Sequence, residues 1–321
     1  MAKPTNAQLN KKSKVRSRTS PSRPSDCLDK AMARKKTRIK FIDLFCGIGG
    51  FRLAMESASS QRGIQAECVF SSDIDSDAQN AYEANFGERP IGDITAVKSS
   101  DVPDHNLLFA GFPCQAFSII GDRKGFEDSR GTLFFDIARI LKAKKPEAFV
   151  LENVKQLRTH NNGATLARIL ETLDGLGYHV HHRVLNALNF GVPQKRERIF
   201  IVGFRRPLDF DWPVGGVPMR PLSELLEVAV PQAYYASREI VLSRRTKMHG
   251  RKLPPGRTVW HENKGGNIGV HPYSCALRAG ASYNYLLVDG ERRLTEREML
   301  RLQGYPDSFK IVCNYSATRK Q

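Results

Sequence analysis

Short apolar runs alternate with amphipathic stretches between residues 38 and 204. Runs rich in Val, Ile, Leu and Phe predict strands over residues 39–45, 67–72, 106–110, 148–151, 178–185 and 198–204. Apolar residues at helical spacing predict helices over residues 51–58, 76–86, 132–144 and 164–176. Strands that alternate with helices of this length predict an α/β fold with a doubly wound, mostly parallel sheet.

The pattern changes on either side of this segment. Residues 206–270 carry many Pro and Gly and two basic clusters, so we expect an irregular region. A last helix is expected over residues 295–302, with Thr295 as N-cap and Glu298 completing a capping box. Residues 1–37 are rich in Lys, Arg, Ser and Pro without a hydrophobic period, which predicts a disordered tail.

Most of the net charge of +17 comes from the N-terminus. The first 40 residues hold thirteen Lys and Arg against two Asp, whereas the rest of the chain is only mildly basic. Charge therefore permits a nucleic-acid partner without proving one. The six cysteines form no C-x-x-C pair and no zinc-type cluster, so we expect free thiols in a reducing cytoplasm and no metal. No apolar run has the length of a membrane span, and no secretory signal is visible.

Two features predict a nucleoside-bearing ligand. The first strand runs into adjacent glycines at Gly49 and Gly50, which lets the backbone approach a ligand closely. The second strand ends at Asp73, and an acid at that position suits ribose hydroxyls. The adjacent glycines differ from the dinucleotide-binding G-x-G-x-x-G spacing.

Three later segments carry candidate chemistry at strand ends. The third strand is followed by Cys114 in a Pro-containing loop, and the fourth by Glu152. Loops at the carboxyl ends of parallel strands meet at one edge, which favours Cys114 as a nucleophile beside Glu152. Arg196 and Arg198, at a spacing of two, point the same way on an incipient strand.

Several motifs of this chain occur in the same order as those of the C5-cytosine DNA methyltransferases of bacterial restriction–modification systems, and the chain resembles this family. The resemblance covers about residues 38–310. It rests on residues 41–50 (FIDLFCGIGG), 92–94 (GDI), 111–118 (GFPCQAFS), 131–136 (GTLFFD), 152–154 (ENV), 194–198 (QKRER), 293–298 (RLTERE) and 304–307 (GYPD).

The resemblance implies a catalytic domain over 38–205, a target-recognition region over 206–270, and a return to the catalytic domain over 271–321. It implies that the thiolate of Cys114 attacks C6 of cytosine. Glu152 would contact N3 and donate a proton there, and Arg198 would contact O2. Arg196 and Gln194 would order the site. No metal is implied.

The implied cofactor is S-adenosyl-L-methionine. Its adenine would lie against Phe45, with Asp73 on the ribose and Ile74 beside it. The remaining cofactor positions implied by the motifs are Ile48, Gly50, Asp93, Ile94, Pro113 and Leu133. The family often has Glu where this chain has Asp73, a departure that would weaken the geometry slightly.

The implied substrate is double-stranded DNA with the target cytosine flipped out of the helix. A loop over residues 119–129 would close over the DNA, and its glycines would give it the freedom to move. Arg123, Lys124 and Arg130 are candidates for contacts with DNA phosphates. Candidates for base or phosphate contacts are Trp260, His261 and Asn263. For each of them, a solvated surface position without a role in DNA binding is an equally good interpretation. The usual biological role of such an enzyme is to protect host DNA from a cognate restriction endonuclease, in the cytoplasm and at the nucleoid.

Alternatives remain open at this stage. The adjacent glycines disfavour a nicotinamide oxidoreductase. They do not disfavour the tRNA-methylating branch of the family or a catalytically incomplete DNA-binding subunit. The family's Gly-Asn-Ser motif and last helix would follow the segment that ends at Gln321. Gly-Asn-Ser occurs nowhere in the sequence. The isolated chain is therefore expected to bind cofactor weakly and to methylate slowly or not at all, and a complementing subunit that carries the missing segment would restore activity.

Overall fold

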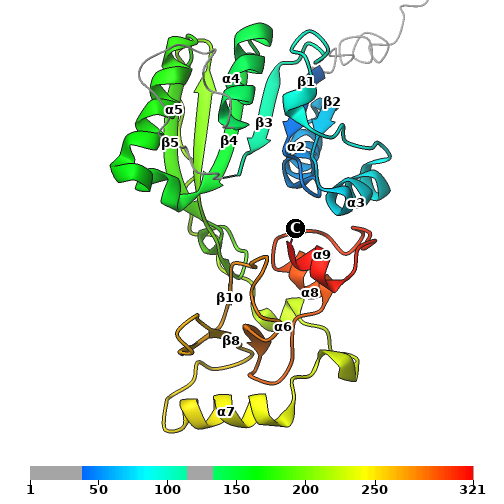
Figure 1. The fold of residues 1–321 in the computed structure, drawn as a ribbon, viewed down its shortest axis with the longest axis vertical. Helices are drawn as coiled ribbons and strands as arrows, with labels where there is room; N and C mark the ends of the chain where they lie inside the picture. Colours follow the sequence, from blue (N-terminus) through cyan, green and yellow to red (C-terminus); the bar gives the residue numbers. More distant parts are fainter. Residues whose placement is uncertain (1–37, 114–132, 321) are drawn as a thin grey trace, which may run out of the picture. The chain divides into compact units, whose positions relative to one another are not determined.

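A six-stranded sheet forms the centre of the N-terminal part of the fold (Figure 1). The computed structural model describes residues 38–113 and 133–320, and the structural statements below refer to these stretches. The strand order is β2-β1-β3-β4-β7-β5. The strands are β1 (Arg38–Leu44), β2 (Gln65–Ser72), β3 (Leu107–Gly111), β4 (Ala148–Val154), β5 (His179–Asn186) and β7 (Glu197–Phe204). All neighbours pair in parallel except β7, which is antiparallel to β4 and β5. The predicted mostly parallel sheet is confirmed.

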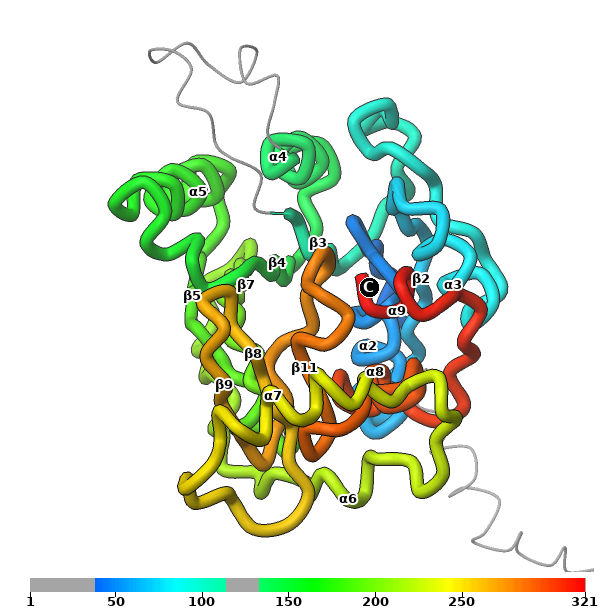
Figure 2. Tube along the Cα trace, turned by 60° about the horizontal axis from the view of Figure 1, so that its bottom comes forward, coloured from blue at the N-terminus to red at the C-terminus, as the bar shows by residue number. Residues whose placement is uncertain are grey.

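Helices cover both faces of this sheet (Figure 2). Ile42 and Leu44 of β1 lie in one core with side chains of α4 and α5, whereas Phe109 of β3 stacks on Phe51 of α2 at 5.0 Å. Alternate residues of a strand face opposite ways, so one strand layer serves two cores. The helices are α2 (Gly50–Gln61), α3 (Ser76–Phe86), α4 (Leu133–Lys144) and α5 (Ala164–Gly175). None of the described helices is long and apolar enough to cross a membrane.

Strand β4 extends further than its apolar run predicts. Glu152 and Asn153 lie within the strand, because β7 pairs with it as far as Val154. Their side chains therefore alternate: Asn153 is buried and Glu152 is half-buried. This register places the Glu152 carboxylate opposite the end of β3, where Gly111 is its partner.

Most of residues 206–270 lie outside helices and strands, as expected, but the region also has regular elements. It contains helix α7 (Arg238–Met248) and strands β8 (Val259–Glu262) and β9 (Ile268–His271). Helix α7 buries only Arg244 and Met248, so it shows no apolar stripe in the sequence. The two strands have four residues each, too few for a clear alternation.

Residues 206–302, called the second part below, share a hydrophobic cluster whose members come from both sides of position 271. Strand β11 (Leu286–Val288) pairs with β8 of the small sheet β11-β8-β9. Leu222 and Leu225 of α6 (Leu222–Leu225) pack in one cluster with Leu286 and Leu302. Residues 286–302 therefore contribute to the core of this second part, and the chain returns to the first part at the end of this stretch.

The return to the first part is made by α8 (Glu296–Arg301) and the residues after it. Leu300 and Phe309 pack with Ile48 of the glycine turn and with α3. The expected capping box of α8 is present, since Thr295 accepts from the Glu298 amide and Glu298 accepts from the Thr295 amide. Figure 2 shows α8 and α9 (Tyr315–Lys320) on the side of α2 and α3.

Candidate active site

The carboxyl ends of β1, β3 and β4 lie side by side. Leu44 pairs with Ala110, and Gly111 pairs with Glu152. The glycine turn after β1, the Phe112-Pro113 segment after β3 and the Glu152 carboxylate therefore meet at one edge of the sheet. Ligands of open α/β sheets bind at this edge.

The glycine turn is shaped by backbone geometry and by Asp73. Gly47 and Gly49 have φ of 53° and 87°, and a Cβ on Gly49 would lie 2.2 Å from the Phe86 ring. The Asp73 carboxylate accepts from the Gly47 amide at 2.8 Å and from the Asp75 amide at 2.9 Å. Asp73 thus fixes the turn and keeps further lone pairs for a ligand.

Exposed apolar side chains lie beside Asp73. Ile74 is 75% exposed and Ile91 is 50% exposed, while the Asp73 amide donates to the Ile91 carbonyl at 2.9 Å. Asp93, also exposed, caps the short helix η1 (Ile94–Ala96) by accepting from the Thr95 amide. The surface formed by Asp73, Ile74, Ile91 and Asp93 therefore combines apolar side chains with carboxylates. This combination suits a nucleoside, which has an apolar base and ribose hydroxyls.

The other expected cofactor residues differ in their exposure. The side chains of Ile48 and Ile94 are buried in hydrophobic clusters, so any ligand contact by them would involve their backbone atoms. Phe45 has a φ of 54° and is half-buried against the main core. Leu133 is half-buried, whereas Gly50 and Pro113 are exposed.

Glu152 is ion-paired with two arginines. Its Oε1 lies 2.8 Å from Nε of Arg198 and 4.0 Å from Nη2 of Arg196. Burial lowers the pKa of Arg196, and the charge of Arg198 lowers it further, whereas Glu152 acts in the opposite direction. Two guanidinium groups against one carboxylate give a site with excess positive charge and several N–H donors, which suits a substrate that becomes negative.

Two buried amides support this cluster. Asn153 donates from Nδ2 to the Phe112 carbonyl at 2.9 Å and so holds the backbone that leads into Pro113. The Gln194 side chain is fully buried, and neither amide atom has a hydrogen-bond partner among the described residues. The sequence singled out Gln194 but not the role of Asn153, whose signal was its place between Glu152 and Val154.

The nucleophile candidate Cys114 lies outside the described residues, as do Arg123, Lys124 and Arg130. Pro113, the last described residue before it, follows β3 directly at the edge that carries Glu152. Within 38–113 and 133–320, no cluster of three His, Cys, Asp or Glu side chains is arranged to hold a metal ion.

Arg139 of α4 supports the segment that follows Asp93, and the sequence did not single it out. It donates to the carbonyls of Val97 and Ile94 at 2.9 and 3.2 Å, to Ser99 Oγ at 2.9 Å and to Asp136 at 3.1 Å. These bonds hold η1, which follows Asp93, against the helix that starts at Leu133. The only sequence signal was the i, i+3 spacing to Asp136.

Solved structures of similar fold are methyltransferases. Dnmt2 of S. pombe aligns with a TM-score of 0.60 at 19% identity, over 88% of this chain and 93% of that one. A DNMT2 mutant of Spodoptera frugiperda aligns with a TM-score of 0.66 at 17% identity, over 88% and 93%. At such low identity these alignments establish the fold, which is the α/β methyltransferase fold.

The chain belongs to the C-5 cytosine-specific DNA methylase family, which it matches over residues 39–321. It is 56% identical over 283 residues to the Type II methyltransferase M.NgoBI of Neisseria gonorrhoeae, over 88% of this chain and 87% of that protein. It is 54% identical over 283 residues to M.HaeII of Haemophilus aegyptius, over 88% and 86%. The protein is thus a DNA (cytosine-5-)-methyltransferase by family, and the oxidoreductase alternative is excluded.

Proposed function

We propose that this protein transfers a methyl group from S-adenosyl-L-methionine to C5 of a flipped-out cytosine within a short duplex site. The observation that carries the proposal is the ion pair of Glu152 with Arg198 at the sheet edge where the Pro113 segment leads to Cys114. Its relatives M.NgoBI and M.HaeII are named Type II methyltransferases, which supports a role in protecting host DNA from a cognate endonuclease. With DNA as substrate, the reaction takes place in the cytoplasm, at the nucleoid.

The chemistry starts from the low nucleophilicity of cytosine C5. Attack of the Cys114 thiolate on C6 makes C5 an enamine-type nucleophile and moves negative charge toward N3 and O2. Glu152 donates a proton at N3, and Arg198 donates N–H to O2. Once C5 carries the methyl group, its proton passes to water and N3 returns its proton to Glu152. Cys114 then leaves as the thiolate, which restores the aromatic ring of the product.

Arg196 and Gln194 are positioning residues in this proposal. The charge of Arg196 acts on Glu152 alongside Arg198. The fully buried Gln194 directly precedes Lys195 and Arg196 and anchors the start of the arginine segment. Neither needs to touch the cytosine to keep Glu152 and Arg198 aligned.

The residues around the glycine turn fit S-adenosyl-L-methionine. Gly47, where a Cβ would meet nothing within 4 Å, leaves room for close approach of a ligand to the backbone. Asp73 retains acceptor capacity for the ribose, and exposed Ile74 offers apolar surface for the adenine. Phe45, Gly50, Asp93, Pro113 and Leu133 would surround it, with Ile48 and Ile94 contributing backbone atoms. When bound, the cofactor supplies an electrophilic methyl group.

Arg139→Met is expected to weaken cofactor binding by about ten-fold, because the guanidinium that holds η1 and Asp93 against α4 is lost. Titration calorimetry with S-adenosylhomocysteine measures this change. The matched control is Arg168→Met on α5, because among the described residues this arginine pairs only with the exposed Glu171. Unchanged affinity together with a lowered melting temperature would mean that Arg139 supports the fold alone.

Deleting residues 1–37 is expected to lower DNA affinity and to flatten its salt dependence, while the site preference stays the same. This segment holds eleven Lys and Arg and only two Asp, and each phosphate contact contributes about one to the slope of log affinity against log salt. The control keeps the length and replaces its Lys and Arg with Gln. Loss of folding on truncation would contradict the prediction of an independent tail.

Transfer of a labelled methyl group to duplex DNA and to tRNA, followed by nucleoside analysis, tests the proposed function. We expect 5-methylcytosine in the duplex and none in tRNA. Label in tRNA alone would assign the chain to the RNA-modifying branch and overturn the proposal.

A further inference from the structure

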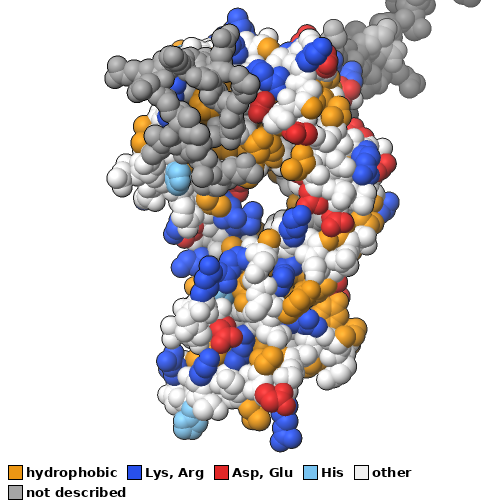
Figure 3. All heavy atoms as spheres, viewed as in Figure 1, with side chains coloured by type: hydrophobic (Ala, Val, Ile, Leu, Met, Phe, Trp, Pro, Cys, Tyr) orange, Lys and Arg blue, Asp and Glu red, His pale blue; other side chains and the backbone are white. Residues whose placement is uncertain are grey.

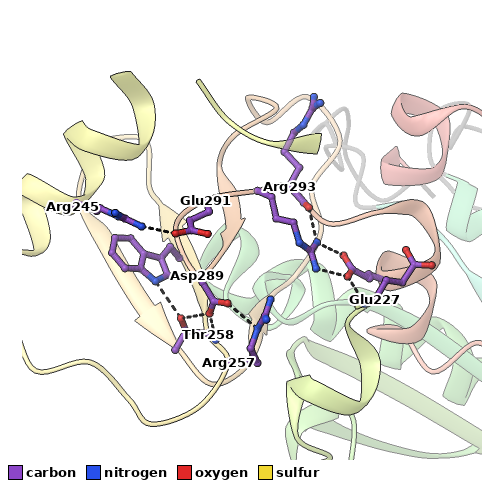
Figure 4. Close-up of polar contacts among 10 residues, drawn as sticks. Glu227, Arg245, Arg257, Thr258, Asp289, Glu291 and Arg293 are labelled. Carbon is purple, nitrogen blue, oxygen red and sulfur yellow. Dashed lines mark hydrogen bonds and ion pairs between the residues drawn. The ribbon is translucent and has the colours of Figure 1, made fainter. Parts of the chain in front are cut away.

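Six of the twelve arginine side chains between residues 206 and 302 form ion pairs with carboxylates. Arg257 contacts Asp289 at 2.7 Å and Arg245 pairs with Glu291, as Figure 4 shows. Arg292 forms a buried two-point contact with Glu298 at 2.8 Å. Arg244 and Arg301 are similarly paired with Glu262 and Asp307. Guanidinium groups bound to carboxylates hold this part together and are not available to another ligand.

Arg278 differs from these arginines. It is exposed, and among the described residues its guanidinium has neither a carboxylate partner nor a hydrogen bond. It lies over the ring of Tyr285, 5.1 Å from the centroid, and its own backbone amide donates to Tyr285 Oη at 2.9 Å. Tyr285 is buried and contacts His261 edge-on at 6.3 Å. The side chain is therefore held at both ends while its N–H donors remain unused.

The strand that leads to Arg278 connects it with the candidate active site. Strand β10 (Ser274–Cys275) pairs in parallel with β6 (Gln194–Lys195), and β6 leads directly into Arg196 and Arg198. Arg278 follows β10 by three residues, which span at most about 11 Å. The step between the paired strands adds about 5 Å, and the three residues from Lys195 to Arg198 add at most about 11 Å. The backbone of Arg278 therefore lies at most about 27 Å from that of Arg198, which is within the length of roughly eight base pairs stacked about 3.4 Å apart.

The surroundings of Arg278 are positively charged. Burial raises the pKa of the Cys275 thiol, while Lys195 and Arg278 both lower it. Burial lowers the pKa of His261, and Arg278 lowers it further. Figure 3 shows Lys and Arg side chains gathered on the drawn face at the level of β10. An anionic partner is therefore favoured at this surface.

We propose that Arg278 recognises a guanine close to the target cytosine by donating two N–H groups to its O6 and N7. Such a two-point contact is the commonest specific contact between an arginine and DNA. A guanidinium fixed over an aromatic ring suits an oriented base edge, whereas a phosphate contact needs no such orientation. The inference rests on the proposed function, because it needs duplex DNA as substrate.

Selection of bound duplexes from a randomised pool tests this inference without requiring turnover. The wild-type protein is expected to select one motif, and Arg278→Gln is expected to lose its preference for guanine at one position by roughly 5- to 150-fold. Arg278→Lys, which retains the charge but not the planar fork, should lose the same preference. Tyr285→Phe keeps the ring and removes the hydroxyl that holds the Arg278 amide, so it should weaken that preference to a smaller degree.

The control is Arg245→Gln, which removes an exposed arginine of the same part that pairs with Glu291, and the selected motif should not change. Two results with an intact wild-type motif would overturn the inference. One is an unchanged motif in Arg278→Gln. The other is a uniform loss of affinity for all sequences with a salt slope lower by about one, which identifies a phosphate contact. A wild-type protein that selects no duplex motif would instead contradict the proposed function, and the inference with it.

Discussion

Cys114→Ser is expected to abolish methyl transfer, with a rate loss on the order of 10⁴- to 10⁶-fold, the range seen when an enzyme loses its nucleophile. A serine hydroxyl is far less ionised than a thiol near neutral pH, so C6 of the cytosine is not attacked. The measurement is single-turnover methylation of duplex DNA. DNA binding should survive, because the substitution changes a single atom and removes none of the Lys and Arg side chains that could contact phosphates.

A covalent trap gives an independent check on the same residue. Duplex that carries 5-fluorocytosine cannot lose its C5 substituent, so the adduct with the enzyme accumulates. Peptide mapping should identify Cys114 as the modified residue. The matched thiol control is Cys275→Ser, which should still form the adduct. Near-normal methylation by Cys114→Ser, or an adduct on another cysteine, would refute the assignment.

Glu152→Gln is expected to slow methyl transfer by about a hundred- to ten-thousand-fold, the usual contribution of a positioned acid or base. The amide can still accept a hydrogen bond from Arg198, 2.8 Å away in the wild type, but it cannot transfer a proton to N3. Cofactor affinity should change little, because the carboxylate faces the arginines. Single-turnover rates and titration calorimetry separate the two effects.

The control for Glu152 is Glu171→Gln on α5, where the carboxylate is exposed and pairs only with Arg168. Its rate should equal that of the wild type. A Glu152→Gln rate within two- to three-fold of wild type, roughly the scatter of such measurements, would show that the carboxylate takes no part in the chemistry.

Local sequence signals predicted the first part of the fold closely. The helix expected over residues 76–86 is α3, because Asp75 caps its first amides and Gly87 ends it in the left-handed region. The antiparallel direction of β7 could also be inferred, since only a short connection without an α-helix separates it from β5, and parallel neighbours need a longer crossover.

The second part was predicted poorly, because its order comes from long-range contacts. Trp260 was a candidate for DNA contact, but it is buried against Met248 and Ile268, and its Nε1 donates to Thr258. That interpretation is wrong. Asn263, another candidate, uses its side-chain oxygen to accept from the Gly265 and Asn267 amides in the β8–β9 turn.

The residues of the candidate site also divide into those that the sequence could predict and those that it could not. Residue spacing placed Arg196 and Arg198 on the same face of a strand, and only the family resemblance brought them together with Glu152. Arg139 could not be predicted, because its partners Ile94 and Val97 lie more than 40 positions away along the chain. Arg278 also escaped notice, since its significance comes from Tyr285 beneath it and from the pairing of β10 with β6.

Bisulfite sequencing of DNA from cells that express the wild-type chain or Cys114→Ser tests the central claim most directly. The account predicts protected cytosines within one short sequence in cells with the wild-type chain, and none above background with Cys114→Ser. Long expression lets even a slow enzyme leave this mark. Absence of any sequence-specific 5-methylcytosine with the wild-type chain, or an equal pattern with Cys114→Ser, would contradict the account.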